Sequence, residues 1–441
     1  MTSNNKPTKN QIILTVLSAS GGYLDGFSLL IIASVVILLI PVFKLNAIQI
    51  GEVVSFSYLG SFFGAIMVGY FVDRMGRRII YLLDLSLFII FSIMSAFSIN
   101  FDMLLISRIL IGIAIGMDLP VSGALIAEFV PPKQRGRLLS TWQMMWVLGA
   151  LTAPFLTIAL LPLGTVAWRY AFGIAAIPAV IILILRTKIP ETPRWLLAQG
   201  RQKDAKSSAT WAAGSSSADL LPSIDQKAYT KENPVHTIFH SKYSKSIGLV
   251  SVISAFAAFG PLFLGSYSIY LAKYFGFTST VEALEFGALV WVFFLIGNIF
   301  NFFATDKIGR KPLLIGGALI VTVTLFVASV VAITDIPVIL VVFIVAALGH
   351  WGGVDQAVWQ YPAELYPTEI RGLARGFTTS WIRMSAFISA LYTPTLFIII
   401  GFGKTMILFG ILEIVVVILS FLLPEVKGKT LEEISGETKL S

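Results

Sequence analysis

The chain has no cysteine and only three histidines among its 441 residues. The absence of thiols excludes disulfides, thiolate metal sites and cysteine nucleophiles. His236 and His240 are four residues apart and would share a helix face, but His350 is distant in sequence and no third ligand accompanies the pair. We therefore expect neither a metal site nor any other cofactor.

Charged residues are scarce as well. They make up only 13% of the chain, while hydrophobic residues make up 56%. Soluble domains carry about 25% charged residues, so this composition indicates an integral membrane protein in a lipid bilayer. The formal net charge is +8, but Lys and Arg gather between apolar runs. Membrane topology explains that distribution better than nucleic-acid binding does, and no nucleic-acid partner is expected.

The first residues, Met1 to Gln11, are polar, and no signal-peptide cleavage pattern follows them, so the first apolar run should stay as a helix. A spanning helix needs about 20 apolar residues. The sequence predicts an all-α membrane protein with twelve transmembrane helices. They are expected at residues 12–39, 50–72, 78–99, 103–130, 137–162, 167–187, 246–275, 284–305, 311–333, 337–363, 373–400 and 404–423.

A long polar stretch, residues 188–245, separates the sixth and seventh helices. Its segment 192–206 is rich in Leu, Ala, Arg and Gln, which predicts short interfacial helices. The chain thus divides into a six-helix unit (1–187), this central loop, a second six-helix unit (246–424) and a tail (425–441). Lys and Arg concentrate in the central loop and in alternate connecting loops, which predicts a cell-membrane protein with both termini in the cytoplasm.

Three sequence marks occur twice. The charged stretch Asp73 to Arg78 returns as Asp306 to Lys311, an interval of 233 residues. Two further marks return at intervals of 236 and 234 residues: Glu128 with Arg135 as Glu364 with Arg371, and Pro190-Glu191 as Pro424-Glu425. An interval shared by three marks indicates two halves of common design within one chain.

Twelve helices, a long central loop and two Asp-x-x-Gly-Arg-type loops resemble the major facilitator superfamily, and most closely its sugar-porter-like branch. The stretches Pro190 to Leu196 and Pro424 to Glu433 carry the same resemblance. It implies two pseudo-symmetric six-helix bundles, related by an axis along the membrane normal. It also implies transport by alternating access, in which the two bundles rock around a central site. We expect a monomer.

The resemblance implies that the repeated charges form a cytoplasmic gate. Opposite charges at an interface that opens and closes give a reversible latch. Each exposed pair contributes little, but a network that is dry in one state and wet in the other biases the equilibrium. Plain topological anchoring is the alternative. The gate residues would be Asp73, Arg77, Glu128, Arg135, Asp306, Arg310, Glu364 and Arg371.

Ionisable groups at membrane depth are functional candidates because burying a charge in lipid is costly. At this depth the sequence has two more acids than bases, so some acids must be protonated, face water or bind a cation. This surplus favours proton coupling or a cationic substrate. The acids are Asp25, Asp118, Asp355 and Glu413, and the bases are Arg108 and Arg383; Glu413 has no assigned role.

The resemblance to sugar-porter-like proton symporters implies that Asp25 and Arg108 form a proton-coupling pair. Burial favours the neutral form of a carboxyl group, and a nearby guanidinium favours the charged form. A static buried ion pair is the alternative. Asp118 lies where metabolite–proton, phosphate–proton and organic-ion branches carry an acid, which implies a second proton or substrate site. Its alternative role is a hydrogen bond that packs two helices.

The resemblance implies a central substrate site between the halves. In the tenth predicted helix, aromatic faces next to a carboxylate and amides suit a small polar ligand. Gln143 lies where sugar porters carry a sugar-binding glutamine, but the paired glutamines of their seventh helix are missing, and Tyr267 and Tyr270, together with Ser266, would substitute only in part. Arg383 would hold an anionic substrate group or neutralise Asp355. The predicted substrate-binding residues are Gln143, Asp355, Gln356, Trp359, Arg383, Tyr267 and Tyr270.

No pattern supports catalysis, and the chain is not expected to be an enzyme. The only near match to a phosphate-binding loop, Gly428-Lys429-Thr430, lacks the earlier glycine. The sequence instead predicts a secondary active transporter that couples proton symport to uptake of a small polar organic solute, a sugar or an organic acid. Export of an organic cation by proton antiport, uncoupled sugar facilitation, and a channel or a sensor that does not transport remain alternatives.

Overall fold

The computed structural model of the chain describes residues 7–130, 132–213, 243–331, 335–354, 360–366 and 368–427. Within them, ten stretches are long and apolar enough to cross a membrane. One of the ten, residues 141–186, contains two crossings, because the chain turns back at η1 (Leu161–Val166). The paired helices α11 (Ser244–Ala257) and α12 (Phe259–Tyr274) make a further crossing. The twelve predicted crossings are thus present.

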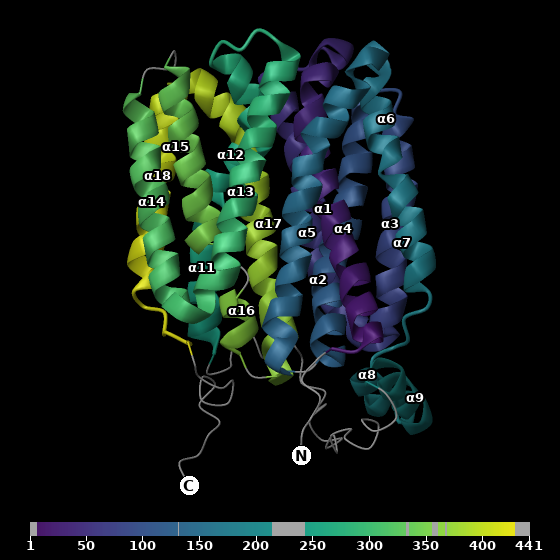
Figure 1. Cartoon of the computed structure of the whole chain (residues 1–441). Coiled ribbons are helices and arrows are strands. Elements are labelled where there is room, and N and C mark those ends of the chain that lie inside the picture. The colour runs from purple at the N-terminus through teal and green to yellow at the C-terminus, as the bar shows by residue number, and fades with distance from the viewer. Residues whose placement is uncertain are drawn as a thin grey trace.

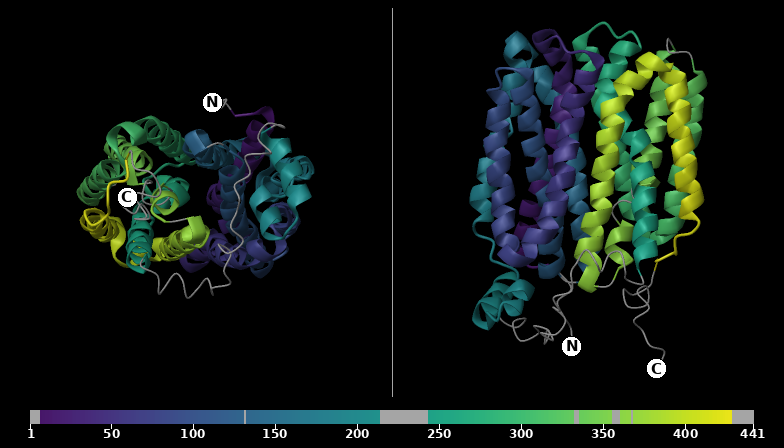
Figure 2. Two further views of the ribbon diagram at one scale, coloured as in Figure 1. Left: turned by 90° about the horizontal axis from the view of Figure 1, so that it is seen from below. Right: turned by 180° about the vertical axis from the view of Figure 1, so that it is seen from behind.

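The crossings form two bundles that lie side by side (Figures 1 and 2). The first bundle contains α1 (Lys9–Phe43), α2 (Ala47–Met75), α3 (Arg77–Ala96), α4 (Phe101–Phe129), α5 (Pro132–Leu160), and α6 (Ala167–Ile174) continued by α7 (Ala176–Arg186). The second contains α11, α12, α13 (Thr280–Ile308), α14 (Arg310–Val330), α15 (Ile336–Gly349) continued by η4 (His350–Val354) and α16 (Tyr361–Glu364), α17 (Thr368–Ile399) and α18 (Gly401–Ser420).

Helices begin where side chains can satisfy the free N–H groups of the first turn. The hydroxyl or amide oxygens of Thr8, Asn46, Asn100 and Ser279 accept these hydrogen bonds at α1, α2, α4 and α13. Such caps are most needed at membrane surfaces, where a helix end leaves four donors without partners.

Small residues bring neighbouring helices of the first bundle into close contact. A Cβ atom at Gly60 of α2 would lie 2.0 Å from the carbonyl oxygen of Ile109 on α4, and one at Gly112 would lie 2.1 Å from that of Ser57. Only glycine allows this approach. Between the bundles, α2 packs against α17, α5 against α13 and α1 against α12, and this interface holds the site described below.

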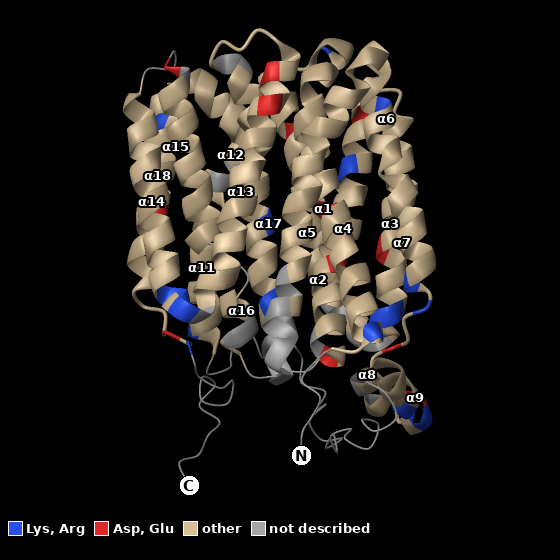
Figure 3. Ribbon diagram, viewed as in Figure 1, with Lys and Arg blue, Asp and Glu red and all other residues tan. Residues whose placement is uncertain are grey.

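Lys and Arg gather at one end of the molecule (Figure 3). The start of α1, the end of α18 and the short helices α8 (Pro193–Ala198) and α9 (Gln202–Ala213) lie at that same end (Figure 1). The sequence predicted short helices in this segment of the central loop, and α8 and α9 lie there; their position at the membrane interface stays a prediction. The amide nitrogen of Asn10 donates to the carbonyl oxygen of Trp211 at 2.6 Å, and the Trp211 ring packs against Phe129. These contacts tie α9 to the first bundle.

The tenth crossing differs from the uninterrupted helix expected over 337–363. After α15 it passes into a π-helical turn, η4, which contains Gly352 and Gly353. A Cβ atom at Gly353 would lie 2.2 Å from the carbonyl oxygen of Leu313, so α14 and η4 touch backbone to backbone. Turns of this kind mark functional sites often, and this one places His350 and Trp351 at the bundle interface.

Candidate functional site

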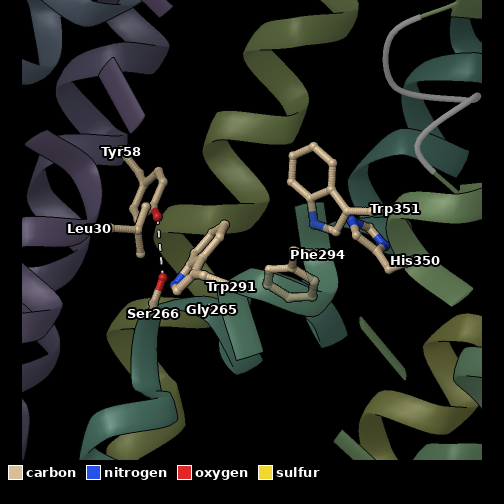
Figure 4. Close-up of a pocket in the computed structure, with 8 residues that line it drawn as sticks. All are labelled: Leu30, Tyr58, Gly265, Ser266, Trp291, Phe294, His350 and Trp351. Atoms are coloured by element: carbon tan, nitrogen blue, oxygen red, sulfur yellow. Dashed lines mark hydrogen bonds between the residues drawn. The ribbon is translucent and has the colours of Figure 1, made fainter. Parts of the chain in front are cut away.

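A cavity lies between the two bundles. In this conformation its free volume is about 20 Å³, which is room for about one water molecule. Its lining residues, drawn in Figure 4, are Leu30 and Tyr58 from the first bundle and Gly265, Ser266, Trp291, Phe294, His350 and Trp351 from the second.

The polar groups of this central cavity come from both bundles. The hydroxyls of Tyr58 and Ser266 lie 3.2 Å apart and form a hydrogen bond across the bundle interface (Figure 4). On the opposite wall, the Nδ1 atom of His350 has no hydrogen-bond partner among the described residues. A buried polar atom without a partner is costly, so a polar solute in the cavity would find groups ready to bond.

Aromatic rings form the rest of the wall. Trp146 of α5 stacks on Trp351 with ring centroids 5.8 Å apart, and it also contacts Trp291. Phe294 meets Trp291 edge-on at 4.8 Å. Rings offer apolar faces, and the indole edges offer N–H donors. The cavity wall thus presents both apolar faces and hydrogen-bonding groups.

A second cavity lies inside the first bundle, and three acids contribute to its wall. Its free volume is about 10 Å³, and Asp25 of α1, Asp84 of α3 and Asp118 of α4 line it. The side chain of Asp25 is buried, and its Oδ2 atom has no hydrogen-bond partner among the described residues. We call Asp25, Asp84, Asp118 and Arg186 the acid cluster.

Arg186, the last residue of α7, holds two of these acids. Its Nη1 atom lies 3.2 Å from Asp84 Oδ2, and its Nη2 atom lies 2.8 Å from Asp118 Oδ1. The guanidinium stacks on the Tyr81 ring at 3.7 Å. Asp118 also accepts hydrogen bonds from Trp142 Nε1 and the hydroxyl of Ser122. These charge-assisted bonds tie α7 to α3 and α4.

The predicted pair of Asp25 and Arg108 is not in contact in this conformation. Arg108 donates instead to the hydroxyl of Ser57 at 2.9 Å and to the carbonyl oxygen of Ser28 at 2.6 Å. The base that acts electrostatically on Asp25 from the other bundle is Arg383 of α17, although the two form no ion pair. The guanidinium of Arg108 is thus hydrogen-bonded to groups on α2 and α1 and not to Asp25.

The membrane charges counted from the sequence were incomplete. Asp84 and Arg186 are both buried within the first bundle, yet sequence reasoning missed them. A signal was present, because Asp84 is a single charge inside an apolar run and Arg186 ends another. Together they add one acid and one base, so the surplus of two acids is unchanged, but Arg186 gives Asp118 an ion-pair partner that the sequence analysis lacked.

The repeated loop motifs form two matching turns, one between α2 and α3 and one between α13 and α14. Glu191 accepts hydrogen bonds from the backbone N–H groups of Arg77 and Arg78 at 3.1 and 3.0 Å. In the second half, the carboxylate of Glu425 accepts from the backbone N–H groups of Arg310 and Lys311 at 3.2 and 3.0 Å. Glu191 thus caps the first turn of α3, and Glu425 caps the first turn of α14.

Glycine is required at both turns. Gly76 has φ of +91° and Gly309 has φ of +110°, and a Cβ atom at Gly76 would lie 2.4 Å from Glu191 Oε2. Partial burial acts to raise the pKa of Glu425, but backbone N–H donors, among them those of Lys427 and Lys311, outweigh it, and that pKa lies below its usual range.

Of the predicted gate, one contact is visible among the described side chains. Arg77 lies 3.3 Å from Glu128, and Arg310 donates to the carbonyl oxygen of Thr305. The remaining predicted gate side chains lie outside the described part of the structure: Asp73, Arg135, Asp306, Glu364 and Arg371.

Comparison with known proteins decides the family. The family model described as "Sugar (and other) transporter" matches residues 8–437. The chain belongs to this family. A putative metabolite transport protein of Escherichia coli, YaaU, is 31% identical over 437 residues, which cover 96% of this chain and 94% of that protein.

Further relatives agree. The arabinose-proton symporter of Bacillus subtilis is 26% identical over 436 residues, covering 96% of this chain and 94% of that protein. The solved structure of the proton:xylose symporter XylE shares the fold, with a TM-score of 0.84 at 24% identity, covering 98% of this chain and 100% of that one. The chain is a sugar or metabolite transporter of the major facilitator superfamily, a multi-pass membrane protein and not an enzyme.

The predicted substrate residues of this transporter are placed as follows. Asp355, Gln356 and Trp359 lie outside the described residues. The Tyr267 hydroxyl donates to the carbonyl oxygen of Ala390 on α17. In this orientation of α12, Ser266 lines the central cavity and Tyr267 does not.

Gln143 and Tyr270 are partly buried and do not line the central cavity. The lining residues that the prediction missed, chiefly Tyr58, Trp291 and His350, are single polar or aromatic residues in apolar helices. They carry no motif, so only packing reveals them.

Proposed function

We propose that this transporter is a proton-coupled symporter of a small polar organic solute, a sugar or an organic acid. It works by alternating access in the cell membrane, with both termini in the cytoplasm. The observation that carries the proposal is the buried carboxyl group of Asp25, which has a partnerless oxygen and lines a cavity beside two further acids.

Alternating access follows from where the central cavity lies. Both bundles line it, and the Tyr58–Ser266 hydrogen bond joins them across it. A rigid-body rotation of one bundle against the other breaks such contacts on one side and exposes the solute there. Because one hydrogen bond contributes only about 0.5–1.5 kcal/mol, this contact does not lock the bundles together.

Proton coupling follows from the solvation of Asp25. A carboxyl group buried without a partner is favoured in its neutral form, and one that water reaches is favoured as the carboxylate. A transport cycle that alternately buries and wets Asp25 therefore binds and releases a proton. The relationship to a Bacillus subtilis arabinose-proton symporter supports this reading.

The chemistry of the cavity sets the class of solute. Stacked indole rings suit the apolar face of a sugar ring, while Tyr58, Ser266 and His350 offer hydrogen bonds to hydroxyls. Arg383 is a buried cation at the bundle interface, without an ion-pair partner among the described residues, and a solute carboxylate would satisfy it. Both substrate classes therefore belong to the proposal.

Matched probes decide between the classes. Purified transporter in proteoliposomes is given D-glucose, L-arabinose or D-glucuronate, with and without an inward proton gradient. Symport is supported if the solute accumulates against its own concentration gradient and if an ionophore that dissipates the proton gradient abolishes this accumulation. Preference for D-glucuronate over D-glucose, lost in Arg383→Gln, assigns the protein to organic acids.

The coupling variant is Asp25→Asn, and its control is Asp204→Asn, since Asp204 lies exposed on α9. Asp25→Asn should abolish gradient-driven accumulation, and Asp204→Asn should not. If the wild-type protein only equilibrates the solute across the membrane, equally with and without the proton gradient, coupling is contradicted and an uncoupled facilitator is favoured. Uptake of protons on export of an amine would favour the organic-cation antiporter.

A further inference from the structure

One buried acid has no part in the proposed coupling. Glu413 lies on α18, in the second bundle, and its side chain is 0% exposed. Neither of its carboxyl oxygens has a hydrogen-bond partner among the described residues. A charge buried at membrane depth is costly unless a partner or water compensates it. The carboxyl group is therefore far more stable here in its neutral, protonated form.

The carboxyl group of Glu413 lies beside the start of α12. A Cβ atom at Gly260, the second residue of α12, would lie 3.6 Å from Glu413 Oε1 and 3.3 Å from Leu325 Cδ1 of α14. Because Gly260 has no side chain, the carboxyl group lies next to the backbone of α12, in apolar surroundings.

The seventh crossing is broken at this point. α11 ends at Ala257 and α12 begins at Phe259. Residue 261 is a proline, which has no N–H group to donate to the carbonyl oxygen of Ala257, as a continuous helix requires. A carbonyl without its usual helical donor thus precedes Gly260, in the part of the bundle where Glu413 has a proton to donate. Interrupted helices often form the coupling-ion sites of transporters.

No cation is bonded to Glu413 among the described side chains. α18 packs against α11, α12, α14 and α17, and neither oxygen of Glu413 bonds to a titratable group on any of them. The first bundle differs, because there Arg186 bonds to two acids. The titratable side chains described on these helices and on α18 itself are Lys245, Tyr267, Tyr270, Arg310, Lys311, Arg375, Arg383, Tyr392 and Lys404.

The helix that touches Glu413 also lines the central cavity. Ser266, further along α12 than Gly260, lines that cavity, and its hydroxyl lies 3.2 Å from the hydroxyl of Tyr58 in the first bundle. A movement of α12 about the break at Ala258 therefore changes the central cavity and the surroundings of Glu413 together.

We propose that Glu413 is a second proton-binding site, which α12 couples to the central cavity, so that two protons cross the membrane with each solute molecule. The inference rests on the proposed symport and extends it from one proton to two. In this conformation, with the central cavity nearly filled by side chains, Glu413 is protonated. When α12 moves and water reaches its start, the O–H bond breaks, the proton passes to that water, and hydration stabilises the carboxylate. Water on the other side of the membrane supplies the next proton.

The test counts the protons that accompany each solute molecule. Proteoliposomes receive a pH difference of about one unit, with no membrane potential, and the opposing gradient of the transported solute (D-glucose, L-arabinose or D-glucuronate) is raised until net flux stops. Each coupled proton multiplies the ratio at which flux stops by about ten. The wild-type protein should stop at a ratio of about 100 and Glu413→Gln at about 10. The matched control, Glu285→Gln, changes an exposed acid of α13 and should behave as the wild type.

A spectroscopic measurement decides the matter if Glu413→Gln does not fold. The solute should change the infrared C=O band of protonated carboxyl groups in the wild-type protein. Glu413→Asp keeps the acid but alters its surroundings, so it should shift part of that change to another frequency. Glu285→Asp should not. A solute-induced change that is identical in the wild type and in Glu413→Asp would overturn the inference.

The flux measurement separates failure of the inference from failure of the proposed function. Equal stopping ratios for the wild type and Glu413→Gln, whether about 10 or about 100, would overturn the second site and leave symport standing. A ratio of about 1 in Glu413→Gln alone would also overturn it, because Asp25 should still carry its own proton. If the proposed function itself is wrong, the wild-type ratio is about 1 at every pH difference.

Discussion

The replacement of Arg186 by glutamine tests the acid cluster most severely. Arg186 forms ion pairs with Asp84 and Asp118 at 3.2 and 2.8 Å, and it is fully buried. Removing one partner of a buried ion pair costs about 3–5 kcal/mol, because the other partner is left as an unpaired charge. Here two carboxylates lose their partner, so we expect at least that range.

The assay is thermal unfolding of the purified protein in detergent. A loss of about 3–5 kcal/mol should lower the melting temperature by roughly 5 °C or more. The matched control is Arg201→Gln, which removes the same side chain from an exposed pair with Asp204 on α9. Exposed pairs contribute about 0–1 kcal/mol, so this variant should melt close to the wild type.

A further variant separates charge from packing. Adding Asp84→Asn and Asp118→Asn to Arg186→Gln neutralises the whole group, and neutral buried groups of similar shape are tolerated far better than unpaired charges. The triple variant should recover most of the lost melting temperature. If Arg186→Gln itself melts within about 1 °C of the wild type, the argument for a buried ion-pair network is refuted.

Three further outcomes are expected. Gly76→Ala should lower the melting temperature, because its φ is +91° and the new methyl would lie 2.4 Å from Glu191 Oε2; Gly164→Ala, with a φ of +65° but open space around it, should do so less. Glu413→Leu should raise the free energy of unfolding by about 1–3 kcal/mol, and with it the melting temperature, because both carboxyl oxygens are buried without partners among the described residues. Glu425→Gln should be less stable than the wild type at neutral pH, and the difference should vanish in acid.

The sign of the last expectation follows from linkage. The folded protein holds the pKa of Glu425 below its ordinary value, so the unfolded chain binds the proton more tightly. The stabilisation is therefore present above the unfolded pKa and disappears as the pH falls through the lower folded pKa. Melting curves of both proteins across that range check it. A difference that stays constant with pH would contradict the assignment.

Equal melting temperatures for Gly76→Ala and Gly164→Ala would contradict the steric argument for the first turn. A lowered melting temperature for Glu413→Leu would mean that this carboxyl group has a partner that stabilises the fold.

The fold was largely predictable because a membrane leaves few alternatives. Backbone groups in lipid must be satisfied within a helix, so apolar runs of the right length become crossings. The turn at Gly76 and its repeat at Gly309 were also readable, since charge and glycine between two apolar runs mark a tight loop. The tenth crossing was not, because the π-helical turn at His350–Val354 depends on glycine contacts with α14.

The site was less predictable because it depends on how each helix is rotated. Adjacent residues of α12 point in different directions, so Ser266 lines the cavity while Tyr267 bonds to α17. Asp25 and Asp118 were found from their depth alone. Their partners were not, because Arg186 lies 68 residues from Asp118 in the chain and only tertiary packing brings them together.

The most direct test of the account is the movement of protons with the solute. Proteoliposomes in weakly buffered medium receive whichever of D-glucose, L-arabinose and D-glucuronate the uptake assay selects, and the external pH is recorded. The account predicts that the medium becomes more alkaline as the solute enters, and that Asp25→Asn abolishes the change. Entry of the solute through the wild-type protein without any pH change would contradict proton symport.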